Sequence, residues 1–547
     1  MRPSASPFKF WLSSSLSIVL FLFTLQLNSQ TCIVPGGQFA DVAALETHLA
    51  TQIASQNCTE IIIDGDIEFS CASNPTTLDI TGPNIDLISV ITGSAYISNC
   101  SSVQTIDGFY KLRSVEGNFE VFGNNVLTTV GDFDNLLYVG ERFRISFNFA
   151  LITLGNFNNL CSVGGEFEIG GNDVLMTIGN FNNLNSVGTN FLILLNSSMT
   201  KIGNFDNLLS VGEQFLIFLN SSMTKIGNFD NLSSVGRTME ISFNDELTSI
   251  GDFKSLCSVG ECFEINDNDN LTSIGDFNNL CSVEERFEIS NDALTTLGNF
   301  NNLCFVGSDF RLRSNQSLSS CCTFKNIFDS EGISGSIFIF NNADGCNSQD
   351  EIQECPDDPI TTECIENVTV PLSDCGTAFI TPCSLIDGPC CGFTASTGGI
   401  DIGDRFGFGC EDIGEHIFSV DNGAGIDCEI TVTVVGDIPV ATIDGPTLIC
   451  AAGSTTLTAS GGDFYAWSTG ETTATITVSP LENTTYSVNV SNSLCGCSDE
   501  ASVEVLVEDC DPIPTLGQWG LIILGLLLLI FGVNVANQSM RVLNQHL

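Results

Sequence analysis

The fold is decided by a stretch from Ile202 to Lys225, which reads Ile-Gly-Asn-Phe-Asp-Asn-Leu-Leu-Ser-Val-Gly-Glu-Gln-Phe-Leu-Ile-Phe-Leu-Asn-Ser-Ser-Met-Thr-Lys. Its three apolar segments are too short for helices, are separated by Gly, Asn and Asp, and alternate with period two around Phe215 and Ile217, which is typical of short strands. The unit recurs every 24 residues. Its glycines are Gly131, Gly155, Gly179, Gly203, Gly227, Gly251, Gly275 and, after a one-residue deletion, Gly298. A constant period predicts stacked turns of a parallel β-solenoid.

Stacked turns place equivalent residues in columns, and the sequence supplies two apolar columns that predict the core. One consists of Phe143, Phe167, Phe191, Phe215, Phe263, Phe287 and Phe310. The other consists of Ile145, Ile169, Ile193, Ile217, Ile241, Ile265 and Ile289. Identical side chains about 4.8 Å apart bury one another, which explains the abundance of phenylalanine.

A polar column has the same period. It consists of Asn148, Asn172, Asn196, Asn220, Asn244 and Asn268. An asparagine at a strand-to-turn corner can satisfy backbone groups of its own turn and of the next, so this column is interpreted as a structural ladder and not as a catalytic array.

Composition excludes several classes of function. The 547 residues carry 65 Asp and Glu against 16 Lys and Arg, for a formal net charge of -49. A surface this negative repels phosphate backbones, so nucleic acid is excluded as a partner. The 3 histidines, His48, His416 and His546, supply no pair at metal-ligand spacing and no base near a candidate nucleophile. Zinc hydrolases and Ser-His-Asp hydrolases are therefore disfavoured.

The two ends of the chain predict export and anchoring. Basic residues precede an apolar stretch from Phe10 to Leu27, so residues 1–30 are interpreted as a signal peptide. Export makes the 24 cysteines a disulfide set whose pairing the sequence does not reveal. Near the other end, Trp519 to Ala536 is apolar and would extend about 27 Å as a helix, just enough for a membrane core of about 30 Å. This predicts one transmembrane helix with the N-terminus outside.

The tail, residues 511–547, resembles bacterial C-terminal sorting signals of the IPTL-CTERM type. The residues that carry the resemblance are Ile513, Pro514, Thr515, Leu516, Trp519 and Gly520, with the leucine-rich segment behind them. The resemblance implies a surface or envelope protein whose tail is recognised by a membrane sorting protease. The basic residues that usually close such a tail are here reduced to Arg541.

The repeat resembles the receptor L-domain, a relative of leucine-rich repeats, through its pattern Leu-x-Ser-Val-Gly-x-x-Phe-x-Ile-x-x-Asn-x-x-Leu-Thr-x-Ile. The resemblance implies a flat-sided binding scaffold of about nine turns over residues 106–355, with no catalytic residues to carry over. Residues 31–105, which include Cys58, Cys71 and Cys100, are interpreted as an N-terminal cap.

Two modules are expected between the solenoid and the tail. Residues 356–436 predict a cysteine-rich β-sandwich, which resembles a hyalin-repeat (HYR-like) module through Phe408 to Gly414 and a closing Val-Thr-Val strand. Residues 437–510 resemble an immunoglobulin-like or PKD-like module, with Trp467 as a core residue. The fold class is thus mainly β: a parallel solenoid, two β-sandwiches and one C-terminal transmembrane helix.

Candidate chemistry is sparse. Glu166 with Glu168, and Asp267 with Asp269, share strand faces as an acid–base pair would, but 65 carboxylates supply such pairs by chance. The run from Asn266 to Asn270 is oxygen-rich but lacks the Gly and Glu positions of an EF-hand, so calcium would be adventitious. No catalytic, cofactor-binding or metal-ligating residue is predicted. Cys161, Cys257, Cys281 and Cys304 share one column, expected to point inward and to keep some free thiols.

These observations predict a membrane-anchored, non-enzymatic surface protein that binds an extracellular ligand, either a glycan or a protein, with adhesion as the favoured role. Two alternatives stay open. A polysaccharide-processing β-helix enzyme would need an acid, a base and an Arg or Lys on one solenoid face. A fungal-type cell-wall L-domain protein would use sequons such as Asn196-Ser197-Ser198, whose asparagine falls in the ladder column.

Overall fold

The computed structural model describes residues 31–543, apart from 55, 57, 357–362, 373–375, 388–392, 399, 402–405, 422–426, 452, 493–496 and 509–515. The predicted signal peptide therefore lies outside the described residues. The described chain divides into two compact units, a larger one made of residues 31–442, 459–474 and 488–501, and a smaller one made of the segments between and after them.

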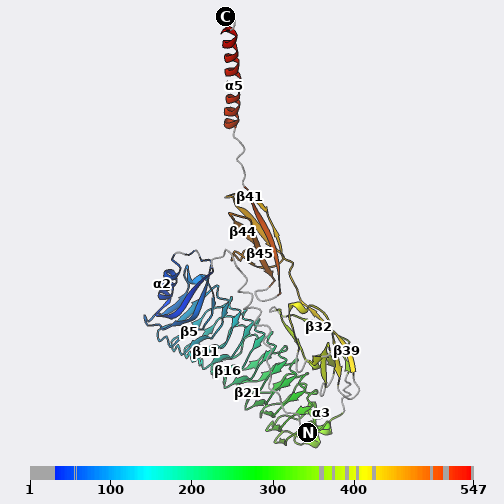
Figure 1. Ribbon diagram of the computed structural model, residues 1–547. Helices are drawn as coiled ribbons and strands as arrows, with labels where there is room; N and C mark the ends of the chain where they lie inside the picture. Colours follow the sequence, from blue (N-terminus) through cyan, green and yellow to red (C-terminus); the bar gives the residue numbers. More distant parts are fainter. Residues whose placement is uncertain are drawn as a thin grey trace, which may run out of the picture. The chain divides into compact units, whose positions relative to one another are not determined.

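A parallel β-solenoid of about 12 turns forms most of the larger unit, which confirms the predicted fold class (Figure 1). Its principal row of strands begins with β1 (Thr31–Phe39) and β2 (Glu60–Phe69). The row continues through β5 (Ala95–Ser98), β8 (Phe119–Phe122), β11 (Phe143–Ser146), β14 (Phe167–Gly170), β16 (Phe191–Leu194), β18 (Phe215–Phe218), β21 (Met239–Ser242), β24 (Phe263–Asn266), β27 (Phe287–Ser290), β29 (Phe310–Arg313) and β30 (Ile337–Phe340).

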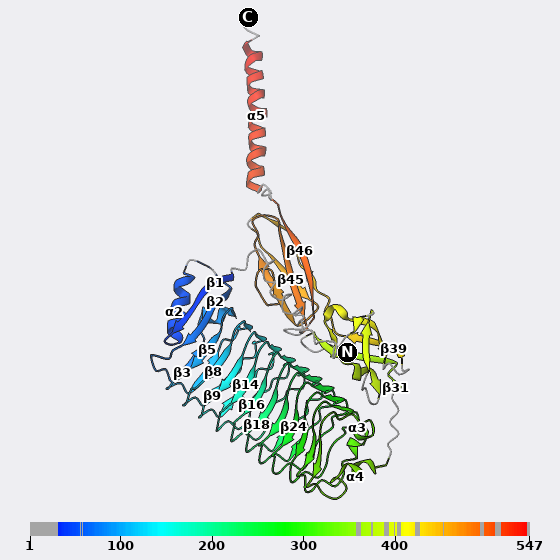
Figure 2. The ribbon, with the colours of Figure 1, turned by 60° about the horizontal axis from the view of Figure 1, so that its bottom comes forward.

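Two further rows of short strands complete each turn (Figure 2). One row consists of β4 (Ile88–Ile91), β7 (Ser114–Val115), β10 (Tyr138–Val139), β13 (Ser162–Val163), β15 (Ser186–Val187), β17 (Ser210–Val211), β20 (Ser234–Val235), β23 (Ser258–Val259), β26 (Ser282–Val283) and β28 (Phe305–Val306). The other consists of β3 (Thr77–Ile80), β6 (Thr105–Gly108), β9 (Thr129–Val130), β12 (Thr153–Leu154), β19 (Lys225–Ile226), β22 (Ser249–Ile250) and β25 (Ser273–Ile274).

The expected number of turns, nine, is too small because strands outside the recognisable repeat join the same stack. β1 pairs with β2 in parallel, and β2 pairs in turn with β4 and β5. At the other end β29 pairs with β30. The segment interpreted as a cap thus forms the first turns, and α2 (Val42–Gln52) packs beside β1. These turns lack the 24-residue period, so periodicity could not detect them.

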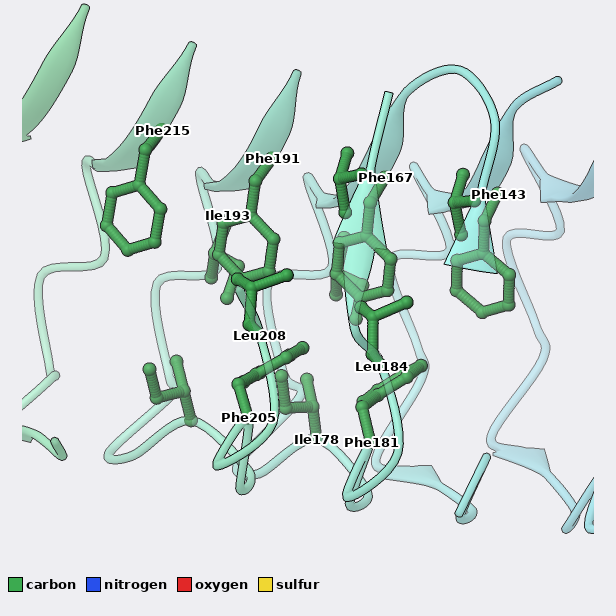
Figure 3. Packing of buried hydrophobic residues seen from close by; sticks show 14 of the residues in the cluster. Phe143, Phe167, Ile178, Phe181, Leu184, Phe191, Ile193, Phe205, Leu208 and Phe215 are labelled. Carbon is green, nitrogen blue, oxygen red and sulfur yellow. The ribbon is translucent and has the colours of Figure 1, made fainter. Parts of the chain in front are cut away.

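Phenylalanine columns fill the interior. Phe143 and Phe167 stack with ring centroids 5.2 Å apart, and Phe167 meets Phe181 edge to face at 5.0 Å (Figure 3). Phe181 belongs to a second buried column, which was not predicted from the sequence and in which Phe157, Phe181 and Phe205 stack with centroids 5.3 Å apart. Stacking within each column and edge-to-face contact between columns are both favoured arrangements of aromatic rings.

The corner asparagines are fully buried and bonded from turn to turn. The Asn220 backbone N–H donates to Asn244 Oδ1 at 3.0 Å, and Asn220 Nδ2 donates to Ile193 O at 2.9 Å. Asn220 Oδ1 in turn accepts from the backbone N–H of Asn196 at 3.2 Å. The six predicted asparagines lie in this ladder, which extends further through Asn124, Asn291, Asn315 and Asn342.

A second ladder runs along another corner, directly after the repeat glycine. Along residues 132–204 and again along 228–299, the backbone N–H of one member bonds to the side-chain oxygen of its equivalent one turn earlier, for example Asp276 to Asp252 Oδ1 at 3.0 Å. Its members include Asp132, Asn156, Asn180, Asn204, Asn228, Asp252, Asp276 and Asn299. The same 24-residue spacing was available in the sequence. The glycines beside it permit close stacking, since a Cβ on Gly179 would lie 1.9 Å from Gly155 O.

Near the C-terminal end of the solenoid, α3 (Lys325–Asp329) precedes β30 and α4 (Gln349–Gln353) follows it. A 3-10 turn at Ile85–Leu87 lies in the first turns, and another at Cys322–Phe324 directly precedes α3. The first module contains the sheet β32 (Asn367–Pro371), β39 (Asp427–Val435), β38 (Gly414–Asp421), β35 (Thr394–Thr397) and β36 (Ile400–Asp401). It also contains the pairs β31 (Glu363–Cys364) with β34 (Ile386–Asp387) and β33 (Ala378–Ile380) with β37 (Phe406–Phe408), and 3-10 turns at Pro382–Leu385 and Cys410–Asp412.

The second module has two sheets, as a sandwich requires. One contains β40 (Thr442–Asp444), β42 (Thr455–Ser460) and β44 (Thr475–Val478). The other contains β41 (Leu448–Cys450), β46 (Ser498–Glu508), β45 (Thr484–Ser491) and β43 (Phe464–Trp467). Trp467 is buried, and its indole N–H donates to Thr473 O at 2.9 Å. The C-terminal helix α5 spans Leu516–Leu543.

Replacing Asn220 by Ala should lower the free energy of unfolding by about 1 to 3 kcal/mol, because the change leaves the Asn196 N–H and the Ile193 carbonyl without their partner. Thermal melting of the purified chain measures the effect. Ser222→Ala, in the same turn but outside the ladder, is the control and should melt like the parent. An unchanged melting temperature for Asn220→Ala would contradict the structural role of the ladder.

Candidate functional site

The outward face of the principal strand row varies from turn to turn. The first and third residues of each four-residue strand point inward, and the second and fourth point outward in exact register with the next turn. The second positions form a column. From β8 to β29 its members are Glu120, Arg144, Glu168, Leu192, Leu216, Glu240, Glu264, Glu288 and Arg311. Within this stretch charged side chains occupy every position except two adjacent ones, and Tyr96 and Phe338 continue the column on either side.

These two leucines belong to what we call the central apolar patch. The patch is formed on β16, on β18 and at the corners that follow the strands, by Leu192, Leu194, Leu195, Leu216, Phe218, Leu219 and Phe243. All seven are at least partly exposed, and Phe243 is 41% exposed. Phe218 and Phe243 touch edge to face with centroids 5.3 Å apart. An outward surface of this kind in a chain of charge -49 is typical of a contact surface.

The patch is built at a conformational cost. Leu195, Leu219 and Phe243 have φ of 58°, 57° and 55°, in the left-handed region that side chains other than Gly and Asn disfavour. Other turns have the same conformation at this corner, in Asn99, Gly123, Phe147, Gly171, Asp267 and Ser314. The corner therefore belongs to the turn itself, and a bulky apolar residue there costs the fold about 1 kcal/mol or more relative to glycine.

A cluster of ion pairs flanks the patch on the side of the earlier turns. Arg144 Nε lies 3.0 Å from Glu168 Oε2, and Arg142 Nε lies 3.0 Å from Glu166 Oε1. The Arg144 guanidinium also lies over the Phe122 ring, 4.1 Å from its centroid. Glu168 is 8% exposed, and burial raises the pKa of its carboxyl above the ordinary value of 4.5, with the Arg144 charge opposing the shift.

A second cluster lies on the side of the later turns. The Glu288 carboxylate is buried beneath two arginines, with Arg313 Nη2 2.5 Å from its Oε1 and Arg311 Nη1 3.4 Å from its Oε2. Arg286 pairs with Glu264. Glu240, Glu264 and Glu288 are stacked in successive turns, so these arginines offset the repulsion between like charges held about 4.8 Å apart.

The residues considered for chemistry lie apart from one another or are already bonded. Glu166 and Glu168 are each paired with an arginine. Asp267 is a left-handed corner residue with φ of 52°, and the Asn268 amide beside it donates to Ile241 O in the ladder. Within the described residues no three Asp, Glu, His or Cys side chains gather as a metal site would require.

The cysteine column was wrongly expected to point inward. Leu160, Leu256, Leu280 and Leu303 fill that interior column, and the cysteines follow them on the outer side. Cys161 and Cys304 are disulfide-bonded, and the Sγ atoms of Cys257 and Cys281 lie 3.5 Å apart. The described disulfides are Cys32–Cys58, Cys71–Cys100, Cys321–Cys346, Cys322–Cys355, Cys364–Cys428 and Cys410–Cys497.

Of the sorting-motif residues, Ile513, Pro514 and Thr515 lie outside the described residues, as do the side chains of Leu516 and Trp519. Gly520 is described and begins a helical stretch in which every Leu, Ile, Phe and Val from 521 to 533 is exposed. Among the residues that the structure describes, no helix is long and apolar enough to cross a membrane. The predicted transmembrane helix therefore stays a prediction.

Comparison with known proteins bears on the tail. Residues 511–534 match the IPTL-CTERM motif, a C-terminal sorting motif consistent with export to the cell surface. No curated protein matches the chain. Among solved structures, the N-terminal eight Ig domains of Down Syndrome Cell Adhesion Molecule (DSCAM) isoform 1.30.30 align at 14% identity and a TM-score of 0.14, over 32% of this chain and 28% of that one. A likeness this weak carries no argument about fold or function.

The raised pKa of Glu168 predicts a pH effect. Well below pH 4.5 the carboxyl is protonated in both the folded and the unfolded state. As pH rises the unfolded chain ionises first, so stability is lost until the folded group ionises too. Wild type should therefore lose stability relative to Glu168→Gln as pH rises from about 4.5 toward neutrality. Denaturant unfolding of both proteins across this range measures the difference. A difference that stays constant with pH would contradict the effect of burial on this group.

Proposed function

We propose that this chain is a non-enzymatic binding scaffold of the cell surface, that it acts in adhesion, and that it binds its partner through the central apolar patch. The observation that supports this most directly is the exposed patch on two adjacent strands, built partly from residues in the disfavoured left-handed conformation. The sorting motif supports a location outside the cell, where such a surface could meet a neighbouring cell or matrix.

The chemistry of the patch favours a protein partner over a glycan. Its members are leucine and phenylalanine, with no Trp or Tyr, whereas sugar sites need hydrogen-bonding groups next to aromatic faces. Apolar side chains at the centre with charged groups around them are typical of protein interfaces. Because this chain carries a charge of -49, we expect a partner with an apolar centre and a basic rim.

The enzyme alternative requires an acid, a base and a cation on one face, and the Arg144 cluster has this composition. Its carboxylates are held by arginines, however, and Glu168 is almost fully buried. The described pockets are lined by other residues. Groups that are bonded to one another and not directed into a pocket support a structural role, so binding without catalysis is the better proposal.

For anchoring, we infer that the tail holds the protein in the envelope through a single pass of its apolar helix. The apolar side chains from Leu521 to Val533 surround the helix on all sides, and such a helix is stable only in an apolar environment. A sorting protease is the expected partner of the motif. The resemblances to receptor L-domain, HYR-like and Ig- or PKD-like modules agree with a scaffold that is displayed on further β modules.

Substitution within the patch should abolish binding without unfolding the chain. Leu192→Glu with Leu216→Glu places two charges at its centre, and binding to the proteins that wild type retains on an array of extracellular proteins and glycans should fall at least about tenfold. The control is Ile152→Glu with Met176→Glu, two exposed apolar residues outside the patch. Equal loss in both variants, or retention of glycans alone, would contradict the proposal.

Location can be tested by truncation. A chain that ends before Pro512 should be released as a soluble, folded protein, because the solenoid core includes no residue of the tail. The full-length chain should fractionate with membranes, or appear on the surface shortened at the tail if a protease acts. Cell fractionation with an antibody against the solenoid distinguishes these results. Full-length protein in the cytoplasm with reduced cysteines would contradict both export and anchoring.

A further inference from the structure

The two ends of the solenoid differ in how their cores are covered. At the first turn, the inward side chains of β1, Cys32 and Val34, are buried. Helix α2 packs beside this strand, and its Leu45 and Leu49 are fully buried in the same core (Figure 2). The N-terminal end of the core is therefore closed by a helix, which is a common way to protect a terminal strand.

The last turn is open along its principal strand. Ile337 of β30 lies in register with Phe310 and so continues the column of buried phenylalanines, yet it is 40% exposed. Phe338 and Phe340, on the outward face, are 38% and 43% exposed. α3 and α4 bury Ile327, Phe328 and Ile352 near this end, but they leave these side chains uncovered.

The strand edge is open as well. In the described part of the chain, β30 forms its strand ladder with β29 alone. A terminal strand in this position presents a row of unpaired N–H and C=O groups along its free edge. Proteins usually protect such an edge with lysine, proline, a bulge or a covering segment. Here the edge sequence is Ile-Phe-Ile-Phe, which has none of these protections and a high tendency to pair.

We propose that β30 pairs with β30 of a second copy of this chain, antiparallel about a two-fold axis, so that two solenoids join end to end. Residues directly opposite in an antiparallel pair point to the same face of the sheet. Centring the pair on Phe338 gives this parity. This register sets Ile337 against Ile339 over the core and Phe338 against its own copy outside, so the strand is complementary to itself.

A second copy fits this end better than another occupant for two reasons. The exposed Ile337 is a core residue, and a partner that covers it must bring an open core of its own, which another β30 end supplies. A head-to-tail arrangement would instead meet the end that α2 covers. Such an isologous contact closes as a dimer and does not propagate into a filament.

Charge near this end also permits the contact. Although the chain has a net charge of -49, two arginines lie on the strand next to β30. The Arg311 guanidinium lies 5.4 Å from the centroid of the Phe338 ring, and it pairs with Asp309 at 2.8 Å. Repulsion then comes from the rest of the two chains, at longer range, where salt screens it. The proposal does not depend on the adhesive function, because it concerns a different end of the molecule.

Sedimentation velocity of the full chain in a non-ionic detergent tests the proposal. We expect a monomer–dimer equilibrium that shifts toward dimer as salt is raised, because screening weakens the repulsion between the two acidic chains. Phe338→Lys with Phe340→Lys should raise the dimer dissociation constant at least about tenfold, since charged edge residues oppose pairing. Phe149→Lys with Ile152→Lys, exposed residues elsewhere on the solenoid, is the matched control and should leave the dissociation constant unchanged.

If the lysine variant is unstable, a photo-crosslinking amino acid of benzoylphenylalanine type at position 338 tests the same contact between two β30 strands. This amino acid keeps an aromatic ring at the position. Illumination should give a covalent dimer whose crosslinked peptides both contain β30. A wild-type chain that stays monomeric at all accessible concentrations and salts would overturn the proposal. So would a dimer whose crosslinks join β30 to another segment, or one that the lysine variant leaves unchanged.

Discussion

The structure depends on one constraint: the polar backbone groups at each corner of the solenoid are buried, and the neighbouring turn must satisfy them. The asparagine ladder meets this constraint because one amide side chain can accept a hydrogen bond from one turn and donate to another. Asn220 does both, with its Oδ1 bound to the Asn196 N–H and its Nδ2 bound to Ile193 O. Each turn is thereby fixed in register with the next, and the stacked phenylalanines follow from that register.

Because the turns are in register, the inward columns stabilise the fold, whereas the outward columns are free to serve binding. Inward columns keep large apolar side chains because each packs against its equivalent one turn away, as Phe143 does on Phe167. Met239, which replaces phenylalanine in one turn, is also apolar and fully buried. Outward columns face solvent and can vary, so each turn contributes an independent position to the surface. The change from charged residues to Leu192 and Leu216 in one outward column is therefore informative, since packing does not require it.

Much of the fold could be predicted because the 24-residue period converts sequence into columns directly. The strand row, the phenylalanine core and the asparagine corner follow from spacing, as Phe215 and Asn220 illustrate. The first turns could not be predicted, because β1 and β2 join the row of parallel strands without sharing the 24-residue period. The candidate site was missed for a different reason. A patch is a property of neighbouring turns, and residues such as Leu195 and Phe243 become neighbours only after the chain has been wound and its outward face identified.

The positions of the disulfides agree with a fold in which each turn contacts only the turns next to it. In a solenoid, stability is approximately a sum over turns and over contacts between neighbours, so a terminal turn has one neighbour where an inner turn has two. Within the solenoid residues, the disulfides described with both partners lie at the ends: Cys32–Cys58 and Cys71–Cys100 link the first turns, and Cys321–Cys346 and Cys322–Cys355 link the last. Crosslinks reduce the conformational freedom of the unfolded segment and so oppose fraying where packing is weakest. At the far end they hold the segment around α3 and α4 in place while β30 keeps its free edge, which shows that an end can be stable without being covered. An uncovered yet covalently supported strand is available for pairing, whereas a frayed one would not be.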